Sequence, residues 1–279
     1  MSEARLPFPL PHALAPLHVR RDGRDGRDGR SDADTPRTLV LLHAICTSGA
    51  LWTPQLDAWR PAFRLLCVDL PGHGESAPLA GDATLADVAD ALAATLDAHG
   101  ESRVTLVGTS WGSMVAQAFA LRHPSRTASL VLAHAGSTTS AEGAALWERR
   151  LSDYDAAPVE QHVRATVDRW LSPVVAQASP TTTRWLEGLV RSTSREGYRQ
   201  AVRTIQRLDH LAVLSAIECP ALVIAGAADR AVPLAAVRTV AATLPAADFV
   251  ALDTGHMSNV EEPATFAALV SGFVRAAPR

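Results

Sequence analysis

The stretch that decides the fold reads Val104-Thr105-Leu106-Val107-Gly108-Thr109-Ser110-Trp111-Gly112-Ser113-Met114-Val115-Ala116. Its first four residues are apolar or β-branched, as in a buried strand, and Gly-x-Ser-x-Gly follows them. Apolar residues then recur at helical spacing until Pro124 stops the helix. In this context the pentapeptide predicts a nucleophile elbow, in which Ser110 is exposed at the carboxyl end of the strand and Gly108 and Gly112 supply small neighbours. An ordinary Ser/Gly turn is the alternative interpretation.

The length and composition of the chain limit the classes of protein to which it can belong. The chain has 279 residues, of which 47% are hydrophobic, and this fits an α/β domain with an insertion and a large core. The formal net charge of −3 argues against a nucleic-acid or anionic-membrane partner. No apolar run approaches the length of a membrane span. The scattered Cys46, Cys67 and Cys219 predict neither a metal site nor a disulfide framework. Together with the lack of a signal-peptide pattern, they favour a cytoplasmic protein.

The N-terminal part differs in character from the rest. We expect it to end in a strand over residues 13–20. An Arg-Asp-Gly tripeptide is then repeated over residues 21–30, without any apolar side chain. Such a segment has nothing to bury, so we expect a surface loop within the core domain.

Continuous apolar runs that end at turns mark the other buried strands. They span residues 39–43, 65–70, 130–134, 221–226 and 249–252. Between residues 136 and 218 the strand signal is absent, and apolar stripes recur at helical spacing around Trp147, Trp170 and Trp185. A helical segment inserted into an α/β pattern predicts a lid over the active site.

Two further polar residues follow strands in the same way as Ser110. Asp229 comes directly after one of the C-terminal strands, and His256 lies in the Gly-containing loop after the next. Carboxyl ends of parallel strands meet at one edge of a sheet, so we expect the three side chains to lie together. His256 would take the proton of Ser110, and Asp229 would hold the imidazole tautomer. Asp253 is the rival acid, but it precedes His256 too closely to face its Nδ1 easily.

The loop after the first apolar run lies beside the expected elbow. We expect the backbone N–H groups of Ile45 and Trp111 to form the oxyanion hole. His43, and His73 with Asp69, are rival candidates for acid–base chemistry. They precede the nucleophile in the chain, so we expect them to tie loops together instead.

The chain resembles the α/β-hydrolase fold superfamily over most of its length. The motifs that carry this resemblance are Leu41-Leu42-His43, Asp69-Leu70-Pro71-Gly72-His73-Gly74-Glu75-Ser76, Gly108-Thr109-Ser110-Trp111-Gly112, Gly226-Ala227-Ala228-Asp229 and Gly255-His256. The resemblance implies a mostly parallel central sheet with helices on both faces. It implies a core of residues 1–135 and 219–279, with a helical lid at 136–218 inserted before the strand at 221–226.

Within the superfamily the chain is most similar to 3-oxoadipate enol-lactonases and their relatives. Trp52-Thr53-Pro54-Gln55-Leu56 and Gly112-Ser113-Met114-Val115-Ala116-Gln117 fit that group, as do Arg169-Trp170-Leu171 and Glu196-Gly197-Tyr198 in the lid. The resemblance implies a small lactone that carries a carboxylate, which would need an inward-facing Arg. The candidates are Arg149, Arg150 and Arg169, whereas the apolar stripes of the lid favour a mainly apolar pocket.

These features predict a serine hydrolase that cleaves a small carboxylic ester or lactone through an acyl-enzyme intermediate, with no metal and no cofactor. Several alternatives use the same triad: a carbon–carbon bond hydrolase, a perhydrolase, a hydrolase of carrier-bound acyl groups, or a non-enzymatic ligand receptor. Fold alone does not decide among them.

Overall fold

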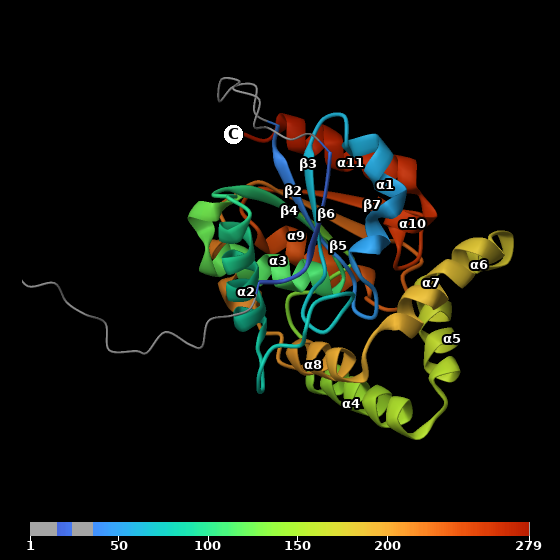
Figure 1. Cartoon of the computed structure of the whole chain (residues 1–279). Helices are drawn as coiled ribbons and strands as arrows, with labels where there is room; N and C mark the ends of the chain where they lie inside the picture. The colour runs from blue at the N-terminus through green and yellow to red at the C-terminus, as the bar shows by residue number, and fades with distance from the viewer. Residues whose placement is uncertain (1–15, 24–35, 279) are drawn as a thin grey trace, which may run out of the picture.

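A seven-stranded sheet forms the centre of the molecule, in the order β1-β3-β2-β4-β5-β6-β7 (Figure 1). The structure is a computed structural model that describes residues 16–23 and 36–278. The edge strand β1 (Val19–Gly23) pairs antiparallel with β3 (Arg64–Val68), and all other neighbouring pairs are parallel. The remaining strands are β2 (Thr38–Leu42), β4 (Val104–Thr109), β5 (Thr127–Ala133), β6 (Ala221–Gly226) and β7 (Ala247–Leu252). The predicted mostly parallel sheet is confirmed.

Helices cover both faces of this sheet, because successive side chains of a strand point to opposite sides. In β2, Val40 and Leu42 pack into one apolar layer, and Leu39 and Leu41 pack into the other. The helices over the first layer are α2 (Leu85–Ala98), α3 (Trp111–Arg122) and α9 (Leu234–Thr243); those over the second are α1 (Thr53–Trp59) and α11 (Pro263–Ala276). Shorter turns are η2 (Gly49–Trp52), η3 (Pro124–Arg126) and α10 (Ser258–Glu261).

A helical insertion, residues 136–218, separates β5 from β6. Its helices are α4 (Ala141–Ala156), α5 (Val159–Trp170), α6 (Pro173–Ala178), α7 (Pro180–Ser192), α8 (Arg195–Gln206) and η4 (Leu211–Ala216). In Figure 1 its green-to-orange helices α4 to α8 lie to one side of the sheet. The helical character expected for this segment agrees with the structure. In the part of the chain that the structure describes, no helix has the length and apolar character needed to cross a membrane.

Helix α8 binds the insertion to the core. The Ser194 hydroxyl donates to the Gly72 carbonyl at 3.0 Å, and the Gln200 side chain bonds both backbone groups of Leu79, at 3.0 and 2.8 Å. Gly72 and Gly197 allow the two backbones to meet, since a Cβ added to Gly197 would lie 1.9 Å from the Gly72 oxygen. The close approach therefore depends on the absence of a side chain at both positions.

We expect Gly197→Ala to lower the free energy of unfolding by about 1–3 kcal/mol, because the new methyl group must push α8 away from the core loop. The matched control is Gly188→Ala in α7, where an added Cβ would have no neighbour within 4 Å. Removing a mid-helix glycine there should raise stability by up to about 1 kcal/mol. Urea denaturation of the two variants measures both effects. Equal stabilities of the two variants would contradict the packing argument.

The N-terminal elements differ from the sequence prediction. The expected strand at 13–20 is found as β1, which starts at Val19; residues 13–15 lie outside the described residues. Arg21 to Gly23, expected within the surface loop at 21–30, continue β1 and pair with β3. The loop prediction was wrong for these three residues because backbone pairing at a sheet edge needs no apolar side chain. The Asp22 carboxylate is also held by the Arg60 guanidinium, at 2.8 and 2.9 Å. Residues 24–30 lie outside the described residues.

Candidate active site

The elbow between β4 and α3 holds Ser110 in a left-handed backbone conformation, with φ 53° and ψ −118°. This conformation is costly for a residue with a side chain and is stabilised here by its surroundings. The Ser110 N–H donates to the Ala133 carbonyl at 2.8 Å. A Cβ added to Gly108 would lie 2.6 Å from the Gly112 backbone, and one added to Gly112 would lie 2.2 Å from the Leu42 oxygen. Both flanking glycines are therefore required by close backbone contacts.

The structure brings Asp229 and His256 together in the loops after β6 and β7. His256 Nδ1 and Asp229 Oδ2 are 2.8 Å apart, and both side chains are almost completely buried. The other oxygen, Asp229 Oδ1, accepts the N–H groups of Ala231 at 2.7 Å and Val232 at 2.9 Å. These donors fix the carboxylate plane, so that Oδ2 faces the imidazole.

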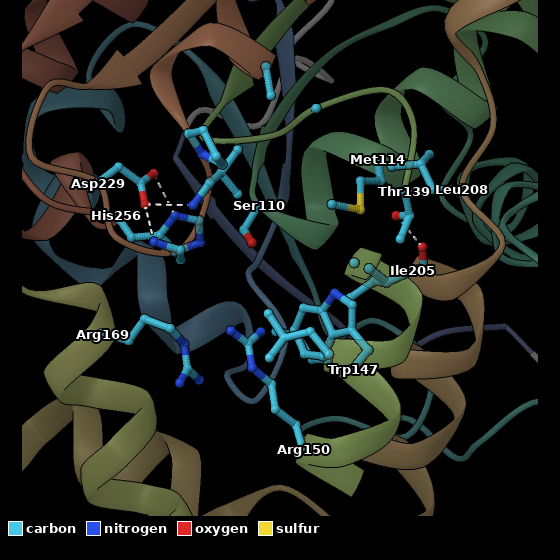
Figure 2. A pocket seen from close by; sticks show the side chains of 18 of the residues that line it. Ser110, Met114, Thr139, Trp147, Arg150, Arg169, Ile205, Leu208, Asp229 and His256 are labelled. Atoms are coloured by element: carbon cyan, nitrogen blue, oxygen red, sulfur yellow. Dashed lines mark hydrogen bonds and ion pairs between the residues drawn. The ribbon is translucent and has the colours of Figure 1, made fainter. Parts of the chain in front are cut away.

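Ser110 and His256 line one cavity and lie near one another in Figure 2. The Ser110 hydroxyl makes no hydrogen bond with any residue that the structure describes. Hydrogen bonds between a nucleophile and its base are often long in the free enzyme and tighten when substrate binds. Ser110 lines the cavity but is only 6% exposed, so it is more buried than the sequence predicted, because the helical insertion covers this end of the sheet.

The charge on Asp229 follows from its partners. Burial acts to raise the pKa of this carboxyl, but the neighbouring imidazoles of His256 and His134 outweigh it and hold the pKa well below its usual value. An ionised Asp229 accepts the Nδ1–H of His256. This leaves Nε2 of His256 as the free basic nitrogen.

The backbone of the His256 loop is attached to the helical insertion. The His256 N–H donates to the Trp170 carbonyl at 2.7 Å, and the two rings stack with centroids 6.4 Å apart. Glu261 Oε1 accepts the N–H of Gly255 at 3.1 Å and that of Ser172 at 3.0 Å. The end of α5 and the loop that carries His256 therefore form one connected unit.

The sequence pattern did not indicate a role for His134 in the site. It predicted this residue as the last one of a buried strand. The structure ends β5 at Ala133 and places His134 in the left-handed region, with φ 56°. Its fully buried ring lies between two polar groups, with Nδ1 3.1 Å from Asp229 Oδ2 and Nε2 2.7 Å from Ser258 Oγ. The only sequence signal was a histidine that ends an apolar run, the same signal that His43 gives.

The two expected oxyanion donors lie next to the elbow. Trp111 is the first residue of α3, where a backbone N–H has no partner within the helix. Ile45 lines the same cavity as Ser110. The chain turns directly after it, since Cys46 is left-handed and its N–H donates to His73 Nε2 at 3.1 Å. Within the described residues the Ile45 N–H has no hydrogen-bond partner, so it is free to bind a ligand.

The rival histidines tie loops together, as expected. His43 donates from Nδ1 to the Ala44 carbonyl at 2.7 Å, and its Nε2 accepts the Leu70 N–H at 2.9 Å. His73 donates to the Pro71 carbonyl at 2.9 Å through its own Nδ1. Burial lowers the pKa of His43 to about 4 and that of His73 to about 3, so both rings are neutral.

The cavity over Ser110 has a volume of about 540 Å³ and lies between the core and the helical insertion. Most of its lining is apolar, as the stripes of the insertion predicted. The apolar lining residues include Ile45, Met114, Trp147, Trp170, Ile205 and Leu208. A cavity of this size and character suits a small organic molecule.

Two guanidinium groups interrupt this apolar lining. Arg150 on α4 and Arg169 on α5 both line the cavity and extend toward it in Figure 2. Neither has a carboxylate partner among the described residues, although Arg169 contacts Thr166 Oγ1 at 3.4 Å. Burial, together with the charge of the nearby Arg169, lowers the pKa of Arg150 to about 10. Both groups remain charged at neutral pH. Of the three candidates from the sequence, only Arg149 is exposed and outside the cavity lining.

His134, Asp229 and His256 are also the group of possible metal ligands that the described residues bring together, with donor atoms within 4.8 Å of one another. The nitrogen atoms that face Asp229 are already at hydrogen-bond distance from its carboxylate. The other ring nitrogen of His134, Nε2, is at hydrogen-bond distance from the Ser258 hydroxyl. These atoms are therefore already used in hydrogen bonds, and the three residues do not fit a metal ion.

Comparisons with known proteins agree with this architecture. The sequence pattern of the family described as alpha/beta hydrolase fold matches residues 37–263. The 3-oxoadipate enol-lactonase 1 of Acinetobacter baylyi (strain ATCC 33305 / BD413 / ADP1) is 25% identical over 257 residues, which cover 92% of this chain and 96% of that protein. The crystal structure of the enol-lactonase from Burkholderia xenovorans LB400 matches with a TM-score of 0.84 at 26% identity, covering 93% of this chain and 96% of that one. A thermophilic esterase from Thermogutta terrifontis, studied with malate bound, matches with a TM-score of 0.83 at 25% identity, covering 93% of each chain.

Proposed function

The chain belongs to the alpha/beta hydrolase fold family, and from that premise we propose that it is a serine hydrolase of small carboxylic esters or lactones that carry an anionic group. The observation that carries the proposal is the placement of Ser110, Asp229 and His256 around one cavity, each at the carboxyl end of its strand. This is the arrangement that acyl transfer through a serine requires.

In the first half of the proposed reaction, Ser110 Oγ attacks the carbonyl carbon of the substrate. His256 Nε2 accepts the hydroxyl proton, and Asp229 stabilises the resulting imidazolium through Nδ1–H. The backbone N–H groups of Ile45 and Trp111 donate to the developing oxyanion, which is commonly the largest single contribution to catalysis. Collapse of the tetrahedral intermediate breaks the bond to the alkoxy oxygen, which takes the proton from His256.

In the second half, water replaces the alcohol product. His256 removes a proton from this water, which attacks the acyl-enzyme carbonyl, and the same oxyanion hole holds the second intermediate. The carboxylic acid leaves, and the proton returns to Ser110. A lactone reacts in the same way, except that its alcohol and acyl parts belong to one molecule, so no alcohol leaves before deacylation and a single product is released. Every step uses residues of this chain.

The anionic part of the substrate is proposed from Arg150 and Arg169. Two like charges that face one cavity without acid partners among the described residues repel each other, and an anion would relieve that repulsion. A carboxylate is the group whose geometry a guanidinium matches. The relatives support this class: one acts, by its name, on 3-oxoadipate enol-lactone, and the Thermogutta terrifontis esterase was studied with bound malate, a dicarboxylate. The helical insertion would then act as a lid that supplies the anion site.

The alternatives share the triad and differ in what they do with it. A carbon–carbon bond hydrolase would cleave diketones, and a perhydrolase would deacylate with peroxide. A hydrolase of carrier-bound acyl groups would need a protein partner. A ligand receptor would bind substrate with negligible turnover. No described residue specifically favours one of these over ester hydrolysis.

The test of the proposal combines labelling with a substrate panel. A fluorophosphonate should form a covalent adduct on the peptide that contains Ser110, seen by mass spectrometry, because the activated serine attacks phosphorus as it does a carbonyl. Purified protein should turn over aryl esters, lactones or enol-lactones faster than diketones. An adduct without turnover of any member of the panel would favour a receptor. The absence of an adduct would contradict the nucleophile assignment.

A further inference from the structure

The acid Asp229 has two imidazole partners where a triad needs one. Its Oδ2 atom lies 2.8 Å from His256 Nδ1 and 3.1 Å from His134 Nδ1. The ring centroids of His134 and His256 are 5.4 Å apart, and the rings meet edge to face. With the backbone donors of Ala231 and Val232 on Oδ1, the carboxylate has four polar partners.

Ser258 determines which way His134 presents its proton. Burial holds the pKa of His134 below its ordinary value, so the ring is neutral and carries one proton. Its Nε2 lies 2.7 Å from the Ser258 hydroxyl and 3.4 Å from the Ser258 N–H. Both groups can donate to Nε2, so the ring proton resides on Nδ1. His134 therefore donates to Asp229 and does not compete with it for a proton.

Resting on the function proposed above, we propose that His134 is a positioning residue for the catalytic acid, a second imidazole donor that fixes Asp229 Oδ2 and moderates its charge. Donation from His134 reduces the charge that Asp229 offers to the imidazolium of His256. Asp229 therefore holds the His256 Nδ1–H less tightly than a carboxylate with one imidazole partner would. The hydrogen-bonded chain Ser258–His134–Asp229–His256 joins the segments that follow β5, β6 and β7.

Other charged groups near His256 and Asp229 belong to different elements. Glu261 on α10 binds the loop of His256, and Arg230 follows Asp229 and contacts the carbonyl groups of Asp168 and Leu171. Arg169 on α5 and Arg150 on α4 face the shared cavity. All of these groups are present in both the wild-type protein and the His134 variants. A difference between their pH profiles therefore reports the effect of His134.

The paired variants are His134→Leu and His134→Asn. Leucine fills a similar volume but removes both nitrogens. Asparagine tolerates the left-handed backbone and can place its Nδ2–H near the position of imidazole Nδ1, which restores the donor to Asp229. Ser258→Ala removes the hydroxyl that donates to His134 Nε2, while the His134 ring and the donating Ser258 N–H stay in place.

We expect His134→Leu to lower kcat by about 10- to 100-fold with KM nearly unchanged, the effect of losing a hydrogen bond to a charged group. The acidic limb of its kcat/KM profile should move to higher pH, because Asp229 then holds the His256 proton more tightly. His134→Asn should restore the position of the limb and most of kcat. Ser258→Ala makes the His134 Nδ1–H a weaker donor, so it should shift the limb in the same direction as leucine but by less, and it serves as the test if His134→Leu fails to fold.

A purely structural role would lower activity or stability without moving the acidic limb, and an unmoved limb in both His134→Leu and Ser258→Ala would overturn the proposal. A second readout does not depend on turnover. The low-field proton resonance of His256 Nδ1–H should shift further downfield in His134→Leu, as its bond to Asp229 strengthens. If the wild-type protein hydrolyses nothing, the proposed function fails, whereas this resonance still tests the link between His134 and Asp229.

Discussion

Ser110→Ala and His256→Ala will each lower kcat by about 10⁴-fold or more, because a triad acts as a unit and the loss of either member removes the nucleophile or its base. The variants should still be faster than the uncatalysed reaction in water, because the oxyanion hole and substrate binding remain. Steady-state kinetics on the fastest aryl ester measure the loss. Unchanged thermal unfolding would show that it arises in the chemical steps.

Asp229→Asn and Asp253→Asn form the matched pair for the acid. Asp229→Asn should lower kcat strongly, since an amide in its place favours the wrong tautomer of His256. Asp253 is exposed at the end of β7, and its replacement should leave kcat near wild type. If Asp253→Asn were the inactive variant and Asp229→Asn the active one, the assignment of the acid would be wrong.

Replacement of Arg150 or Arg169 by Met will reverse the substrate preference. The informative substrates are an aryl monoester of a dicarboxylic acid, with its free carboxylate, and the corresponding methyl diester. Each substitution should lower kcat/KM for the carboxylate by about 30-fold or more, because truncating one partner of a partly buried charge pair costs several kcal/mol. The neutral diester should change little or react faster, since the like-charge repulsion in the cavity is reduced.

Arg149→Met is the control for this preference, because Arg149 is an exposed neighbour on the same helix. It should leave the ratio of the two kcat/KM values unchanged. Faster turnover of the neutral diester by the wild-type protein would contradict the anionic substrate class and leave a general apolar esterase.

The strands, and the positions of Ser110, Asp229 and His256 after them, could be predicted because they depend on local patterns. Buried parallel strands are continuous apolar runs, and Ser110, Asp229 and His256 each follow one. The same holds for α2, where Thr84 and Asp87 have the three-residue spacing of a capping box and form both of its hydrogen bonds. In each case the short-range sequence and the long-range packing favour the same structure.

The features that escaped prediction depend on contacts between distant segments. Arg21 to Gly23 have no strand pattern of their own and become a strand only by pairing with β3. His134 acquires a role from Asp229, which is 95 residues away. Helical periodicity could not decide which of Arg149, Arg150 and Arg169 faces the cavity, because the answer depends on how the insertion packs on the core.

The attachment of the His256 loop to the end of α5 has a consequence for protein engineering. The helical insertion is not an exchangeable module, because Trp170 supplies the acceptor for the His256 N–H, and Glu261 joins Gly255 to Ser172. A chimera that transplants the insertion of a relative must also recreate these bonds. Directed evolution of specificity is better aimed at α4, whose Trp147 and Arg150 line the cavity; within the described residues no hydrogen bond joins α4 to the His256 loop.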